Sequence, residues 1–244
     1  MPKPTGAVFR VSDALVQRII SEEYSPGLRL PSEIDLSVEF ACGRSTIREA
    51  LRHLAGLNLV QSRRGSGAVV LDFRREGGLE LMAPYFQYGK FDHPLPVMVK
   101  EMLRLRSMLA CEAARLAATY ASAAAIVSLR RKVEWCDSAR EDAQEHSLRE
   151  LELFRSMAQS SLIWPYAWLA NAFTSSMREV LKMVAGSLSA VPPNWVETMS
   201  VLMGHVERHD PDSAVQHLGA HFRHVDGLVA QGLEELFAGR DVLT

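Results

Sequence analysis

The sequence predicts a mostly α-helical protein with two domains: a small N-terminal domain of three helices and a β-hairpin, followed by an all-α bundle of about seven helices. Apolar residues recur at helical spacing through most of the 244 residues. Strand-like segments are almost confined to the two sides of a glycine-containing turn near residues 63–67. A polar stretch at 73–78 ends in two glycines and is expected to be a linker between domains at 8–72 and 79–240.

The first two helices are defined by their apolar spacing and by their ends. Val11, Leu15 and Ile19 predict an amphipathic helix over 10–24, which Pro26-Gly27 ends. Ser32 is placed to cap a second helix, because Asp35 follows it at the spacing of a capping box. Two helices are therefore expected before residue 41.

A tight turn at 41–43 leads into a third helix, whose buried stripe comprises Ile47, Ala50, Leu51 and Leu54. Asn58 is expected to end this helix, since asparagine tolerates the left-handed conformation. Strands are then predicted on both sides of a hairpin tip at 63–67. Three helices and a β-hairpin in this order predict a winged helix-turn-helix.

Beyond the linker, prolines and polar turns divide the sequence into helical segments. They are expected at about 79–89, 95–120, 122–143, 146–161, 164–188, 193–208 and 211–238. The predicted fold of this part is an all-α helical bundle.

Positive charge concentrates in the N-terminal domain, where residues 1–75 hold 11 Lys and Arg against 8 Asp and Glu. The start of the third helix carries Arg44, Ser45, Thr46 and Arg48, the positions from which such a helix reads the major groove. Arg52 lies one turn further on and is expected at the DNA backbone, and Arg63, Arg64 and Gly65 at the hairpin tip can approach the minor groove. A merely solvated basic face remains the alternative.

Three segments carry a family resemblance: residues 26–33 (PGLRLPSE), 43–51 (GRSTIREAL) and 64–67 (RGSG). They resemble the DNA-binding head of the GntR family of bacterial regulators. The remainder resembles the helical ligand domain of its FadR-type branch through Leu105-Arg106 and residues 112–118 (EAARLAA). This resemblance implies a homodimeric regulator, expected to be a repressor, that binds a short palindromic operator.

The same resemblance bears on a metal site. Most relatives with this helical domain hold a divalent metal through one Asp and three His, and the corresponding positions here are Leu151, Arg155, Met199 and His221. A single imidazole cannot hold a first-row metal, which ordinarily needs three or more protein ligands. We therefore expect no metal and no cofactor, although the pairs His205/His209 and His217/His221 leave a different metal site open.

Arg155 can replace the charge of that metal, because a guanidinium binds a carboxylate or phosphate bidentately. We hypothesise a site for an anionic small-molecule effector, an organic acid or an acyl-CoA-like molecule; its residues are Arg155, Arg106, Asn171, Met199 and His221. Phe154-Arg155 resembles the fatty-acyl-CoA-responsive members of the branch, which also lack the metal ligands. An internal ion pair of Arg155, for example with Glu112, is the alternative.

Other function classes lack support in the sequence. It contains no nucleophile motif, P-loop, G-x-G-x-x-G or H-E-x-x-H, so no enzyme is expected. No stretch is long and apolar enough to span a membrane, and we expect a cytoplasmic protein. The alternative function is an effector-independent DNA-binding protein whose helical domain only dimerises.

Overall fold

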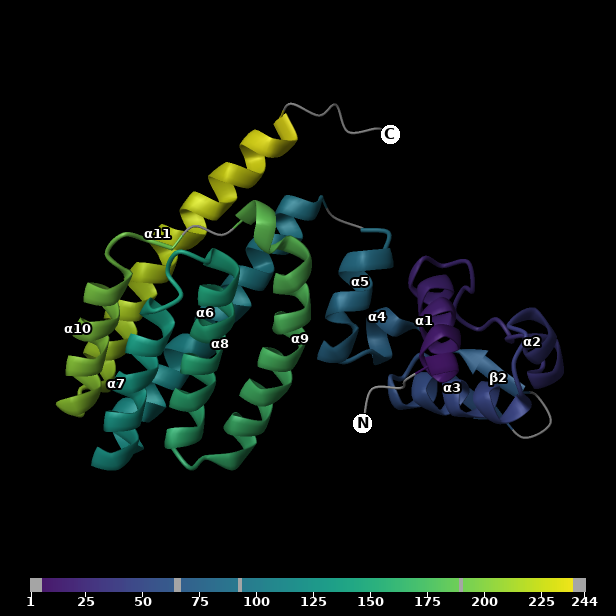
Figure 1. The fold of residues 1–244 in the computed structure, drawn as a ribbon, viewed down its shortest axis with the longest axis horizontal. Helices are drawn as coiled ribbons and strands as arrows, with labels where there is room; N and C mark the ends of the chain where they lie inside the picture. The colour runs from purple at the N-terminus through teal and green to yellow at the C-terminus, as the bar shows by residue number, and fades with distance from the viewer. Residues whose placement is uncertain (1–5, 64–66, 92–93, 189–190, 239–244) are drawn as a thin grey trace. The chain divides into compact units, whose positions relative to one another are not determined.

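A computed structural model of the chain describes residues 6–63, 67–91, 94–188 and 191–238. The chain divides into two compact units, Met1–Phe91 and Asp92–Thr244, each with its own hydrophobic core. The first holds a three-helix domain with a hairpin and the second a helical bundle, so the predicted fold class is confirmed (Figure 1). Among the described residues, no helix is both long and apolar enough to cross a membrane.

The first unit contains the three expected helices, α1 (Gly6–Ile20), α2 (Glu33–Glu39) and α3 (Arg44–Gly56). Helix α1 begins and ends earlier than the expected 10–24, and Glu22 after its end has a left-handed φ of +62°. Ser32 caps α2 as predicted: its hydroxyl accepts from the Asp35 amide at 3.2 Å, and the Asp35 carboxylate accepts from the Ser32 amide at 3.2 Å. Asn58 has a φ of +55°, the left-handed conformation expected after α3. Local chemistry therefore fixes the ends of α2 and α3.

The hairpin pairs β1 (Val60–Arg63) with β2 (Gly67–Val70) in antiparallel register, Val60 opposite Val70. The segment Leu28–Leu30 lies along the other edge of β2, since the Leu30 amide donates to the Ala68 carbonyl at 2.9 Å and the Val70 amide to the Leu28 carbonyl at 2.9 Å. We did not predict this pairing from the sequence, because the segment is too short to show a strand pattern.

The segments expected as the linker and the first bundle helix belong to the first unit in the structure. Residues 73–78 contain a short helix, α4 (Phe73–Glu76), and are followed by the 3-10 turn η1 (Leu79–Leu81) and α5 (Met82–Tyr88). Phe73 and Leu81 are buried in the core of the first unit, and the Tyr88 hydroxyl donates to the Asp13 carboxylate of α1 at 3.2 Å. The boundary between the units thus falls after Phe91 and not at 73–78, because α5 packs against α1.

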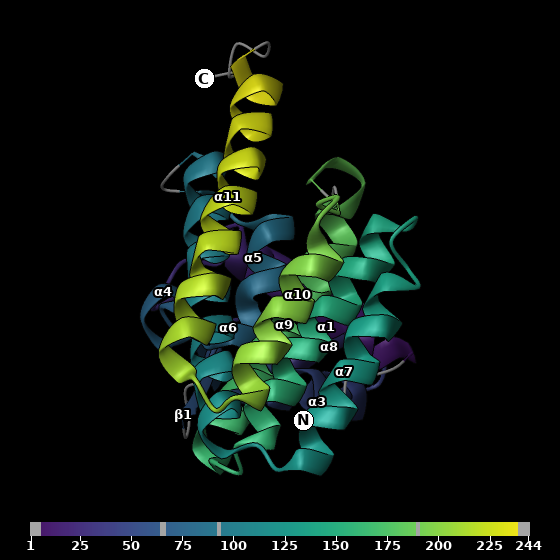
Figure 2. The same ribbon diagram turned by 90° about the vertical axis from the view of Figure 1, so that its left-hand side faces the viewer.

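The second unit is a bundle of α6 (Leu95–Tyr120), α7 (Ala123–Asp137), α8 (Ala143–Ser160), α9 (Trp164–Leu188), α10 (Trp195–Glu207) and α11 (Pro211–Ala238). Figure 2 shows α10 and α11 side by side, with the last turns of α11 extending past the neighbouring helices. The central helix is α6, which packs against α8, α10 and α11. Its buried face is almost all alanine, at positions 110, 113, 114, 117 and 118, and small side chains let the helices approach closely.

Candidate functional site

The first turns of α3 are held with one face buried and the opposite face in solvent. Ile47, Ala50 and Leu54 are fully buried and pack with α1 in the core of the first unit. Arg44, Ser45 and Arg48 are exposed and Thr46 is half-buried. Gly43 precedes the helix without a side-chain cap, so the first amide groups of α3 keep their capacity to donate to an anion.

The exposed arginines of α3 differ in their partners. Nε of Arg48 donates to Oε2 of Glu33, at the start of α2, over 2.7 Å. Arg52 pairs with Glu49 one turn away on its own helix. In the part of the chain that the structure describes, Arg44 forms no ion pair. A groove of about 300 Å³ lies between α3 and the hairpin; Glu33, Arg48 and Arg52 line it together with apolar residues such as Leu51 and Val60.

The hairpin tip is described only in part. The backbone of Arg63 ends β1, whereas its side chain, Arg64 and Gly65 lie outside the described residues. Their predicted DNA contacts therefore stay predictions.

In the second unit, α6, α8 and α9 enclose a cavity of about 20 Å³, room for about one water molecule. Arg106 and Arg155 both line it, among apolar neighbours that include Phe154, Tyr166 and Phe173. Arg106 pairs with Asp226 of α11 at 2.5 Å and lies over the ring of Phe222, 4.5 Å from its centroid. Its Nε is buried and has no partner among the described residues.

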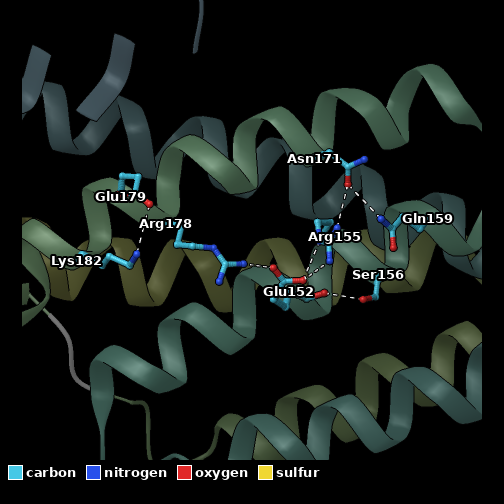
Figure 3. A network of polar contacts seen from close by, with 8 residues as sticks. All are labelled: Glu152, Arg155, Ser156, Gln159, Asn171, Arg178, Glu179 and Lys182. Atoms are coloured by element: carbon cyan, nitrogen blue, oxygen red, sulfur yellow. Dashed lines mark hydrogen bonds and ion pairs between the residues drawn. The ribbon is translucent and has the colours of Figure 1, made fainter. Parts of the chain in front are cut away.

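Arg155 belongs to a polar network around Glu152 (Figure 3). Glu152 accepts from Nε of Arg155 at 2.8 Å and also pairs with Arg178 of α9. NH1 of Arg155 donates to Oδ1 of Asn171 at 3.4 Å, and Gln159 donates to the same oxygen at 3.1 Å. One carboxylate thus faces two guanidinium groups, and the network keeps an excess of positive charge.

The structure brings together three of the five predicted effector residues: Arg106 and Arg155 at the cavity, and Asn171 on Arg155. Met199 is fully buried in the bundle core and does not line this cavity. His221 is half-buried against Phe222, and burial lowers its pKa; Glu150 opposes this shift and Arg106 adds to it. The alternative pair with Glu112 does not form, because Glu112 binds Arg115. The spacing of Glu152, three residues before Arg155 on one predicted helix, could have indicated that partner, whereas Arg178 of α9 had no sequence signal.

The fold separates one of the two histidine pairs considered as a metal site, and His217 and His221 of the other pair both lie on α11. His209 lies beyond the end of α10 with a φ of +53°, so it does not share a helical face with His205. Nε2 of His217 lies 2.9 Å from the carbonyl oxygen of Thr198. Within the described ranges, no three His, Cys, Asp or Glu side chains are grouped as metal ligands would be.

Comparisons with known proteins agree with this architecture. Residues 8–70 match the sequence profile of the bacterial regulatory proteins of the gntR family. The galactonate operon transcriptional repressor of Escherichia coli K12 is 24% identical over 208 residues, 85% of this chain and 90% of the relative. The fatty acid metabolism regulator protein of Serratia proteamaculans is 26% identical over 148 residues, 60% of this chain and 59% of the relative.

A solved structure extends the likeness of fold over the chain. The Listeria monocytogenes protein Lar, described as controlling expression of the agr system, matches 96% of this chain and 100% of its own with a TM-score of 0.54 at 15% identity. The family and the curated relatives are DNA-binding transcription regulators and not enzymes, as the sequence predicted. Residues 8–70 therefore carry the DNA-binding head of the gntR family of bacterial regulatory proteins.

Proposed function

We propose that this regulator is a homodimeric repressor that reads a palindromic operator with the first turns of α3. The observation that carries the proposal is the exposure of Arg44, Ser45 and Arg48 on a helix whose other face is fixed in the core. Arginine grips guanine bidentately, and hydroxyl groups such as those of Ser45 and Thr46 bind phosphate or base edges. Arg52 and the hairpin residues Arg63, Arg64 and Gly65 supply backbone and minor-groove contacts in this proposal.

The test is selection of binding sites from random duplex DNA, followed by fluorescence anisotropy on the enriched sequence. Arg44→Ala is expected to weaken operator binding at least tenfold, because each bidentate base contact contributes about 1–3 kcal/mol and a dimer makes it twice. Arg104→Ala removes an equally charged, exposed side chain from α6 and should leave the affinity unchanged. Equal effects of the two substitutions, or enrichment of no site, would contradict the proposal.

We infer that the homodimer forms through the outer face of α9. Trp164, Trp168 and Leu169 of α9 are exposed, and so are Leu162 and Ile163 just before the helix; residues 156–177 contain no charged side chain. Interface centres are depleted of charge and enriched in tryptophan. The five side chains offer roughly 500 Å², since large apolar residues bury about 150–250 Å² each when fully covered. This is more than half of the about 800 Å² per partner in a stable interface, and a second copy offers the same apolar face.

The helical unit is proposed to bind an anionic effector at Arg106 and Arg155, with Asn171 holding Arg155. The supporting observation is the buried, unpartnered Nε of Arg106 among the described residues, beside a cavity that both arginines line. Galactonate and fatty acids, named in the two relatives, are both carboxylic acids. A cavity of one water volume must widen to admit either, so binding requires α6, α8 and α9 to move apart.

The effector proposal is tested by thermal shift with sugar acids, fatty acids and acyl-CoA. A binding acid should raise Tm, change operator affinity and lose both effects in Arg155→Ala. Arg130→Ala, which breaks an ion pair with Glu207 elsewhere in the bundle, is the matched control. If every acid leaves Tm and operator affinity unchanged, the protein is the effector-independent regulator that the sequence left open.

A further inference from the structure

The contact between Glu33 and Arg48 joins two helices of the DNA-binding unit at their exposed side. Glu33 is the first residue of α2 and Arg48 lies in the second turn of α3. The turn at residues 40–43 brings them together across fifteen positions of sequence, with Nε of Arg48 2.7 Å from Oε2 of Glu33. Both side chains keep much of their surface in solvent, so Arg48 can still reach another molecule.

This contact selects which edge of the guanidinium is available. A guanidinium can grip two acceptors with its NH1/NH2 end or with its Nε/NH2 side. Because Nε already donates to Glu33, the NH1/NH2 end is left for the N7 and O6 acceptors of a guanine. The carboxylate also disfavours an alternative contact of Arg48 with phosphate, since like charges would be brought together.

We propose that Glu33 is a positioning residue that directs Arg48 to a base edge and so determines specificity at one base pair of each half-site. This inference rests on the proposed reading of DNA by α3 and adds a residue outside the helix that touches the bases. A side chain fixed by a hydrogen bond also loses less conformational freedom when it binds.

The chain contains a matched control in the pair of Glu49 and Arg52. It is also an exposed ion pair between an arginine of α3 and a glutamate, but both residues lie on α3, three positions apart. Glu49→Ala therefore removes the same charge from the DNA-binding unit without releasing Arg48. An effect specific to Glu33 cannot then be attributed to net charge.

The experiment uses the full-length chain and the DNA site selected by the wild type. The base pair that Arg48 contacts is identified first: its substitution weakens binding of the wild type but no longer weakens binding of Arg48→Ala. At that base pair, Glu33→Ala is expected to reduce the discrimination of the wild type about tenfold, and Glu49→Ala to keep it within about twofold. Glu33→Gln should restore most of the discrimination, because its amide oxygen still accepts from Nε although the charge is gone.

The outcomes distinguish a failure of the positioning role of Glu33 from a failure of the proposed reading of DNA by α3. Unchanged discrimination in Glu33→Ala, or an equal loss in Glu33→Gln, overturns the positioning role, as does a lowered Tm with intact discrimination, which indicates a structural role. A wild type that selects no site overturns the proposed function and this inference with it. Loss in Glu33→Ala, recovery in Glu33→Gln and no change in Glu49→Ala together support it.

Discussion

The outer face of α9 makes the dimer testable with one substitution, Trp168→Ala. The side chain is 65% exposed, which corresponds to about 160 Å² of surface for a residue that buries up to about 250 Å². In a twofold dimer each substitution is made twice. A central tryptophan commonly contributes about 2 kcal/mol or more to binding, so the dimer should lose about 4 kcal/mol. Since each 1.4 kcal/mol is tenfold, the dimer Kd is expected to rise about a thousandfold.

Sedimentation equilibrium across a concentration series measures this Kd directly. Trp135→Ala is the control, because Trp135 is also an exposed tryptophan but lies on α7, 4.7 Å below the guanidinium of Arg149. Trp168→Ala should be monomeric at micromolar concentration with an unchanged circular dichroism spectrum, while Trp135→Ala stays dimeric. A Trp168→Ala protein with the wild-type Kd would refute the assignment of α9 as the interface.

Three further predictions concern the helical unit. Burial lowers the pKa of His146 and His221 below the ordinary 6.5, so at mildly acidic pH the unfolded chain binds more protons than the folded chain. Tm should therefore fall as the pH drops from 7.5 to 5.5. An equally steep fall of Tm in His146→Gln would contradict this. Glu152→Gln leaves Arg155 and Arg178 without their shared carboxylate and should cost about 2 kcal/mol in a urea titration, whereas the exposed pair partner Glu101→Gln should cost almost nothing. A chelator should leave Tm unchanged, and a stoichiometric metal by elemental analysis would disprove the expected absence of a metal site.

The elements of the DNA-binding unit were predictable because their signals are local. A cap at Ser32, a left-handed residue at Asn58 and an apolar stripe through Ile47 and Leu54 each act within a few residues of sequence. The bundle helices 95–120, 164–188 and 211–238 were also predicted with the bounds that the structure shows, because prolines and polar turns mark their ends as clearly. Local chemistry was thus sufficient for the elements and for the exposed face of α3.

The amphipathic pattern of 79–89 predicted a helix but not the core that it joins, since an apolar stripe does not specify its partner. Packing of α5 on α1 moved the boundary between the units to Phe91. In the same way, Arg155 was predicted as an anion-binding group, but its contact with Asn171 and the contact of Glu152 with Arg178 follow from how α8 and α9 pack.

The sequence by itself determined the family of the DNA-binding head, the fold class and the charged residues of the third helix, because each depends on spacing within one segment. Only the tertiary structure decided which arginines are already paired. Glu33 meets Arg48, Glu152 meets Arg155 and Arg178, and Asp226 meets Arg106. All but the contact between Glu152 and Arg155 join side chains from different helices, whose distance is set by packing and not by spacing along the chain.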